Sequence, residues 1–245
     1  MLSTLKRCVD KNCICRVCLK KKITKSRKKN ITIKISVDYA RQEFALALEH
    51  IENLVLNDGY TKAEHLSLLE DIAEWIRRDI QADFMHQIIY SEVTPDRGFR
   101  FVPWGYYDES GQYQELQCID ETHTIDFSQD CIITFPWNSS KIAGAFVNLK
   151  NKEFVYHENN HFAYAYNGID IVHVHNGIHS SSVGVYKKQG VIQGKLYDII
   201  PLFRHICTDG KSWLNAHTNE VLDDVYDWRI GLLFEVCRWK HEIID

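Results

Sequence analysis

Apolar residues recur at helical spacing in two consecutive stretches near the start of the folded part of the chain. The first stretch begins near Val37 and stops at Asp58-Gly59, where the glycine is a typical helix end. In the second stretch, Thr61 and Glu64 form a capping box in front of an apolar stripe. Because the connection is short, we predict that the two helices pack on each other as a helical hairpin over residues 37–82.

The pattern then changes to β-branched and aromatic residues interrupted by turn signals, which predicts strands and hairpins over residues 99–135. Ser139 or Ser140 can begin a short helix after them. The rest of the chain alternates strands and helices, and it ends in a helix from about Asp223 to Glu242. These patterns predict an α+β (mixed α/β) fold, in which the helical hairpin packs on a mixed β-sheet and a C-terminal helix closes the chain.

Charge divides the chain into an arm and a body. Residues 1–34 contain 12 Lys or Arg and one acid, Asp10, so their net charge is +11. Because the whole chain has a net charge of -4, the remaining residues carry a net charge of −15. A basic arm can hold nucleic-acid phosphates by releasing counterions, and it can equally be a solvated tail that docks on the acidic body. We predict a single domain over residues 35–245 behind this arm.

Four cysteines of the arm have C-x4-C-x-C-x2-C spacing, and these are Cys8, Cys13, Cys15 and Cys18. Zinc sites usually place two close pairs on separate turns, so this compact spacing leaves two alternatives open, a structural zinc or reduced thiols. The other four cysteines lie in apolar surroundings and are expected in the core.

The first residues place charges where a secretory signal peptide needs an apolar run, and no stretch approaches the roughly 18 apolar residues of a membrane span. We therefore expect a cytoplasmic protein with no membrane partner. A Walker loop, a Rossmann glycine fingerprint and a G-x-S-x-G elbow are all missing from the sequence.

Candidate chemistry is concentrated between residues 157 and 192, which hold five of the twelve histidines. Within this segment, residues 169–175 alternate as a strand, and Asn176-Gly177 then turns the chain. One of the three serines at 180–182 is expected to cap a following helix, which Gly190 ends. A strand, a tight turn and a helix start form an arrangement that suits anions, because the first helical N–H groups have no partner within the helix.

Phosphate is the anion that we predict for this turn. The expected phosphate-binding residues are Asn176, Gly177, Ser180, Ser181 and Ser182. In a catalytic version, histidines act as acid or base and an asparagine orients the reacting groups, and the candidates are His175, His179, His161 and Asn160. The alternative is an ordinary strand-to-helix connection whose histidine is merely exposed.

His157, Glu158 and His161 spell H-E-x-x-H, which on a helix holds zinc and leaves the glutamate as general base. The context argues against a helix, because Asn159-Asn160 is poor helix material and the residues that follow alternate like a strand.

A second metal hypothesis needs no helix. His157 and His161 can meet His173 and His175 if the two extended segments pair as a hairpin through Asn167-Gly168. Such an imidazole cluster suits a divalent metal. The alternative is that these histidines pair with carboxylates or water.

Residues 169–192 resemble the signature of the ParB and sulfiredoxin superfamily, which consists of a hydrophobic strand, a G-x-H-R turn, a helix, a glycine and another strand. The matching positions are Gly177, His179, Ser180, Val183, Gly184, Lys187, Gly190 and Ile192. The resemblance implies that the turn and the helix start bind a nucleotide or nucleic-acid phosphate. Ser180 stands where the superfamily usually has the arginine that meets the phosphate. The pattern also resembles uncharacterised bacterial proteins found among phage-defence genes.

Three functional hypotheses follow. The first is a nucleic-acid or nucleotide phosphate-binding protein that acts as a phosphodiesterase or nuclease in bacterial antiviral defence. The second is a metal-dependent hydrolase built on the histidine cluster. The third is a non-catalytic interaction module, or the regulator of an effector encoded nearby, with the helical hairpin as its docking surface.

Overall fold

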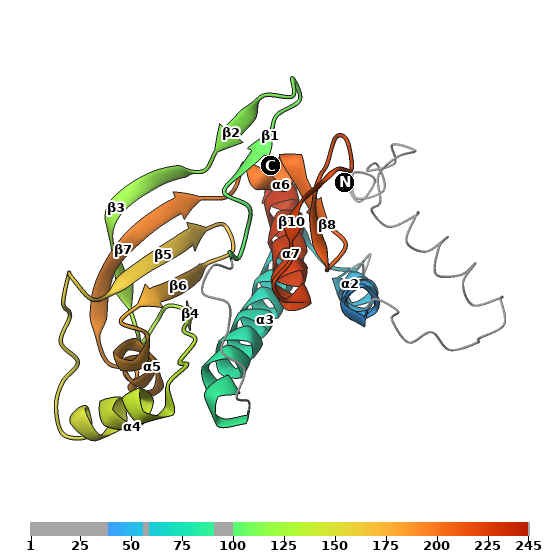
Figure 1. Cartoon of the computed structure of the whole chain (residues 1–245). Helices are drawn as coiled ribbons and strands as arrows, with labels where there is room; N and C mark the ends of the chain where they lie inside the picture. The colour runs from blue at the N-terminus through green and yellow to red at the C-terminus, as the bar shows by residue number, and fades with distance from the viewer. Residues whose placement is uncertain (1–38, 56–58, 91–99, 245) are drawn as a thin grey trace, which may run out of the picture. The chain divides into compact units, whose positions relative to one another are not determined.

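The computed structural model describes residues 39–55, 59–90 and 100–244, and Figure 1 shows their helices and strands. The fold is α+β, as predicted, with helices toward both ends of the chain. The basic arm, its four cysteines and the predicted helix start near Val37 lie outside the described residues. Among the described helices, none combines the length and the apolar character that crossing a bilayer requires.

The chain divides into two compact units. Of the described residues, the first unit comprises those up to Leu69 together with residues 100–115 and 201–244, and the second comprises residues 70–90 and 116–200. The single domain over residues 35–245 stays a prediction.

In the first unit, α2 packs against α7 and buries Phe44, Ile51 and Val55. The strands form the two-stranded antiparallel sheet β1-β2 and the three-stranded antiparallel sheet β10-β9-β8. The elements of this unit are α2 (Tyr39–Val55), β1 (Gly105–Tyr107), β2 (Tyr113–Glu115), α6 (Leu202–His205), β8 (Ile206–Thr208), β9 (Ser212–Asn215), β10 (Val221–Asp224) and α7 (Trp228–Ile244). The C-terminal helix is therefore confirmed, but it begins later than predicted, because β10 occupies the first residues assigned to it.

The second unit is built on a five-stranded sheet in the order β3-β7-β5-β6-β4. The pairs β3/β7 and β5/β6 are antiparallel, whereas β5/β7 and β4/β6 are parallel. Its elements are β3 (Gln117–Asp126), β4 (Ile132–Ile133), α4 (Ser139–Asn148), β5 (Phe162–Asn167), β6 (Ile171–Asn176), α5 (Ile178–Lys187) and β7 (Val191–Asp198), together with most of α3 (Lys62–Tyr90). The hairpin through Asn167-Gly168, on which the second metal hypothesis depends, is present as β5-β6.

The two faces of this sheet carry different side chains. On one face, Ala163, Val174 and Ile192 form an apolar core with Val185 of α5. On the opposite face, α3 covers the β4 side, where the ring of Phe84 packs on that of Phe135. Because side chains alternate between the faces of a strand, neighbouring residues of β5 and β6 belong to different surroundings.

The helix α2 and most of α3 belong to different units, and the helical hairpin over residues 37–82 stays a prediction. The apolar stripe of α2 is buried against α7, whereas α3 anchors to the five-stranded sheet, for example through Gln81, whose Nε2 donates to the Ile132 carbonyl oxygen at 2.9 Å. Local periodicity predicts that a helix forms. It does not predict which surface the apolar stripe of the helix packs against, because that contact joins residues far apart in the chain.

Candidate functional site

The helix α5 begins directly at the turn that follows β6. Gly177 is its N-cap residue, with φ 70° and ψ 20°, and no side chain of the described residues caps the helix. The prediction that one of the three serines at 180–182 caps the helix is wrong, because all three lie inside it. Glycine fits this position for two reasons, since a positive φ is strained for other residues and a Cβ atom would lie 2.3 Å from Cδ2 of His161.

The hydroxyls of Ser180 and Ser182 are oriented by backbone carbonyl groups at the start of the helix. The hydroxyl of Ser180 donates to the Gly177 carbonyl oxygen at 2.9 Å, and that of Ser182 donates to the Ile178 carbonyl oxygen at 2.7 Å. Ser181 is fully buried, and Ser182 is buried against Thr134. Since buried hydroxyls cannot contact a dissolved phosphate, we correct the prediction that Ser181 and Ser182 hold one.

His161 links the preceding turn to the start of α5. Its Nδ1 accepts from the backbone N–H of His157 at 3.0 Å, and its Nε2 lies 3.0 Å from Oγ of Ser180. Burial lowers the pKa of His161, so the ring is neutral and carries one proton, which must sit on Nε2. His161 therefore donates to Ser180, whose own proton goes to the Gly177 carbonyl oxygen. This direction leaves His161 no lone pair with which to activate Ser180 as a base.

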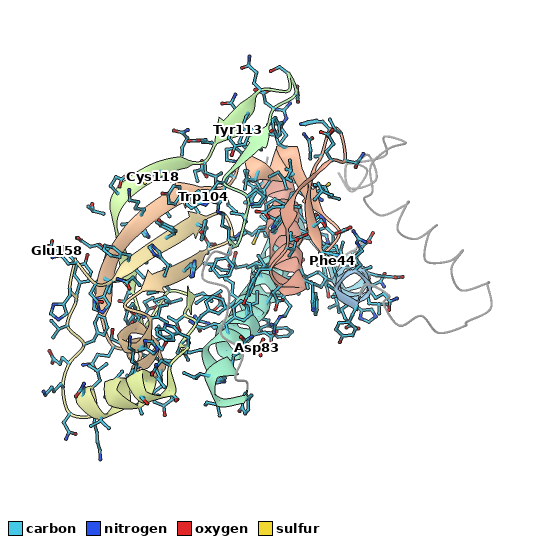
Figure 2. The ribbon with its side chains drawn as sticks, in the orientation of Figure 1. Phe44, Asp83, Trp104, Tyr113, Cys118 and Glu158 are labelled. Atoms are coloured by element: carbon cyan, nitrogen blue, oxygen red, sulfur yellow. The ribbon has the colours of Figure 1, made fainter. Side chains whose placement is uncertain are left out.

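The H-E-x-x-H letters form a tight turn, not a helix, as the context predicted. The backbone N–H groups of Asn160 and His161 both donate to the carbonyl oxygen of His157, and Glu158, labelled in Figure 2, is exposed on this turn. The zinc-protease arrangement, which needs two histidines on one helical face, is absent from this turn.

The four histidines of the metal hypothesis lie in different places. His161 contacts α5, whereas His173 and His175 lie on the opposite face of the sheet, where His173 meets the ring of Phe135 edge-on and His175 contacts Tyr164. Within residues 39–55, 59–90 and 100–244, no group of three or more His, Cys, Asp or Glu side chains lies close enough to hold a metal ion. The hairpin that this hypothesis requires is present, but the pleat of its strands places the two histidine pairs on different faces.

Acid should weaken the second unit through His173. Burial lowers the pKa of His173 from 6.5 to about 3, so only the unfolded chain takes up this proton between those values. The free energy of unfolding is therefore fully retained above pH 6.5 and falls as the pH drops toward 3, by up to about 1.4 kcal/mol per pH unit.

Urea denaturation of the wild type and of His173→Phe at pH 7 and pH 5 measures this contribution. We expect the variant to lose less stability between the two pH values, because phenylalanine keeps an aromatic ring at this position and has no nitrogen that titrates. His86→Gln, a change at an exposed histidine of α3, should behave like the wild type. Equal losses in wild type and His173→Phe would assign the acid sensitivity to other groups.

His179 lies where the first turns of two helices meet. The helix α4 packs against α5, and its N-cap residue is Asn138, whose side chain accepts from the Lys141 backbone N–H at 2.9 Å. The backbone N–H of Asn138 donates to Nε2 of His179 at 3.2 Å. Because His179 is the second residue of α5, the positive ends of two helix dipoles come together at this contact.

Trp137 joins this contact with its indole ring. The rings of Trp137 and His179 meet edge-on with centroids 5.4 Å apart, and Nζ of Lys141 lies 4.9 Å from the centre of the Trp137 ring. Lys141 therefore adds a positive charge beside the two helix starts. The sequence patterns did not indicate Asn138 and Lys141 as parts of the site, because Asn138 lies 41 residues before His179 in the chain. The available signal was that asparagine is a strong N-cap residue.

Two predicted asparagines lie beside the start of α5. Asn176 is exposed and ends β6, and the backbone oxygen of the exposed Asn160 lies 2.9 Å from the position of a Cβ on Gly177. The structure thus brings together Asn160, Asn176 and Gly177, and it places His175 on the other face of the sheet.

No curated protein and no solved structure matches the chain. The model of a family of unknown function, DUF6710, matches residues 19–244. Because the match includes most of the chain, the chain belongs to the DUF6710 family of unknown function.

Proposed function

We propose that this chain binds the phosphate of a nucleotide or nucleic acid at the paired helix starts of α4 and α5. The observation that carries the proposal is the contact between Asn138 and His179, which brings two helix N-termini to one place. We call this surface the paired helix starts and define it by Asn138, Lys141, Asn176, Gly177 and His179.

Electrostatics at the paired helix starts favours an anion. Each helix N-terminus carries roughly half a positive charge and N–H groups without partners in the helix, and each end stabilises a nearby anion by about 0.3–1 kcal/mol. The exposed Lys141 adds a full charge close to the same contact. A phosphate meets both features because it accepts several hydrogen bonds and carries negative charge.

The family resemblance and the arm support the same ligand class. In the ParB and sulfiredoxin superfamily, the turn that resembles residues 177–180 binds phosphate, and the basic residues 1–34 can add affinity for a phosphate backbone. Ser180, which stands in place of the arginine, is directed toward Gly177. Lys141 on α4 is the cation that takes over this role in our proposal.

Binding is better supported than hydrolysis. Of the predicted acid–base groups, His161 is committed as a donor to Ser180, and His175 lies on the opposite face from α5. Only His179 and Asn160 remain near the paired helix starts. We therefore propose phosphate recognition as the activity, with a bacterial cytoplasm and a role in antiviral defence as its proposed setting, and nuclease or phosphodiesterase chemistry as the extension to test.

Substitution of His179 tests the proposal. We expect His179→Ala to weaken the binding of inorganic phosphate and of a nucleoside monophosphate about tenfold in isothermal titration, because the variant loses a polar group at the helix starts. His123→Ala, a change at a half-buried histidine on β3, is the matched control and should bind like the wild type.

Circular dichroism establishes that both variants keep the fold. A folded His179→Ala variant with wild-type affinity would overturn the proposal, as would a wild type that binds neither ligand. Loss of a measurable nuclease activity in the same variant would extend the proposal to catalysis.

A further inference from the structure

The sheet face opposite α5 carries a row of aromatic rings. Phe162 and His175 face each other with ring centroids 6.0 Å apart and planes 19° apart, and the rings of His175 and Tyr164 are 4.4 Å apart. Tyr164 in turn meets Tyr197 of β7 edge-on at 5.5 Å. We call Phe162, His175, Tyr164 and Tyr197 the ring row.

Solvent reaches one end of the ring row. Phe162 is 44% exposed although it lies in a strand, and Tyr164, His175 and Tyr197 are half-buried. In the second unit, α3 contacts this face at the β4 side, through the Phe84–Phe135 ring contact. An aromatic ring left open at the end of a packed row offers a flat apolar surface to another ring.

The polar groups around the ring row are few. Burial lowers the pKa of His175, so its ring is uncharged near neutral pH and stacks as a neutral heterocycle. Its Nε2 is enclosed and has no hydrogen-bond partner within the described residues. On β7, Lys195 lies beside Tyr164 and forms an exposed ion pair with Glu121, and Gln193 is exposed.

At its Phe162 end, the ring row adjoins the strand end that leads into α5. Phe162 pairs with Asn176 across the β5-β6 hairpin, and Asn176 directly precedes Gly177. A chain molecule that has a phosphate at the helix start and a planar ring nearby can therefore contact both places. The negative charge of such a phosphate-containing molecule also complements the net charge of +11 on residues 1–34.

We infer that the ligand is single-stranded nucleic acid, whose unpaired bases stack on Phe162 and the ring row while a phosphate lies at the paired helix starts. This inference rests on the proposed function and names its ligand class. Bases of a duplex are already stacked inside the helix and cannot reach a flat protein surface, so the arrangement selects single strands.

Fluorescence anisotropy with the full-length chain tests the inference. The probes are labelled oligo-dT, oligo-U and a DNA duplex of the same length. Phe162→Ala should weaken the binding of single strands about tenfold or more, because removing one stacked ring typically has this effect, and it should leave the binding of inorganic phosphate unchanged. Phe162→Trp should retain binding, since it keeps a flat ring.

Phe146→Ala is the matched control, because Phe146 on α4 is 43% exposed and lies outside the ring row, against Tyr186. If Phe162→Ala binds single strands like the wild type, or if the wild type prefers the duplex, the inference is overturned while the phosphate site stands. If single-strand binding depends on Phe162 but not on His179, the proposed function fails and the ring row stands. A wild type that binds no oligonucleotide refutes the inference, and phosphate titration then decides the proposed function separately.

Discussion

Replacing Gly177 by alanine should lower the free energy of unfolding of this protein by about 3 kcal/mol. An alanine at φ 70° costs roughly 1 kcal/mol, and its Cβ would lie 2.3 Å from Cδ2 of His161. The ring must then move, and it loses its hydrogen bond to Ser180, which contributes about 1 kcal/mol. Urea denaturation at neutral pH measures the loss.

Gly144→Ala is the control for this prediction. Gly144 lies in α4, where an added Cβ meets nothing within 4 Å. Alanine is the better helix former, so this variant should be as stable as the wild type or more stable by up to about 1 kcal/mol. If both variants unfold like the wild type, His161 does not pack tightly against the start of α5.

Replacing Arg77 by methionine should destabilise the protein by about 2–3 kcal/mol. The Arg77 side chain is only 5% exposed, and it donates to Glu70 at 2.5 Å and to Glu74 at 2.9 Å. It also donates to the Ile169 carbonyl oxygen in the β5-β6 turn, which anchors α3 to the sheet. Removal of one partner of a buried ion pair costs about 3–5 kcal/mol, and the half-exposed glutamates regain part of this by rehydration.

The neighbouring Arg78 offers a control with the same substitution. Arg78 pairs with Glu74 at 2.6 Å, but its side chain is 48% exposed. An exposed ion pair contributes little, so Arg78→Met should change the stability by less than about 1 kcal/mol. Equal effects of the two variants in urea or thermal unfolding would contradict a buried role for Arg77.

The serine-rich start of α5 shows how a local signal can mislead. Serine is a favoured N-cap residue, so three serines in a row predicted the helix start among them. The helix instead begins at Ile178, because Gly177 can adopt the positive φ that the turn requires and because His161 packs against it. The second reason depends on a residue 16 positions earlier in the chain, which no local pattern reports.

The histidines of β6 show that a correct local prediction does not decide which residues meet in the fold. Alternation correctly placed His173 and His175 on one strand face, and the hairpin through Asn167-Gly168, which the second metal hypothesis required, is present. Whether His173 and His175 lie near His161 depends on which face of the sheet packs against α5. The face that does so carries Ala163 and Val174, which are buried with Val185 of α5.

The sequence by itself determined the α+β class, the existence of the helices α2, α3, α4 and α7, and the strand β6, because periodicity, caps and turn residues act over a few neighbouring positions. Only the tertiary structure decided that α2 packs on α7, that Asn138 meets His179 and that Phe162 joins the ring row. Such contacts join residues far apart in the chain, and their free energy comes from burial and packing, which the local pattern does not contain.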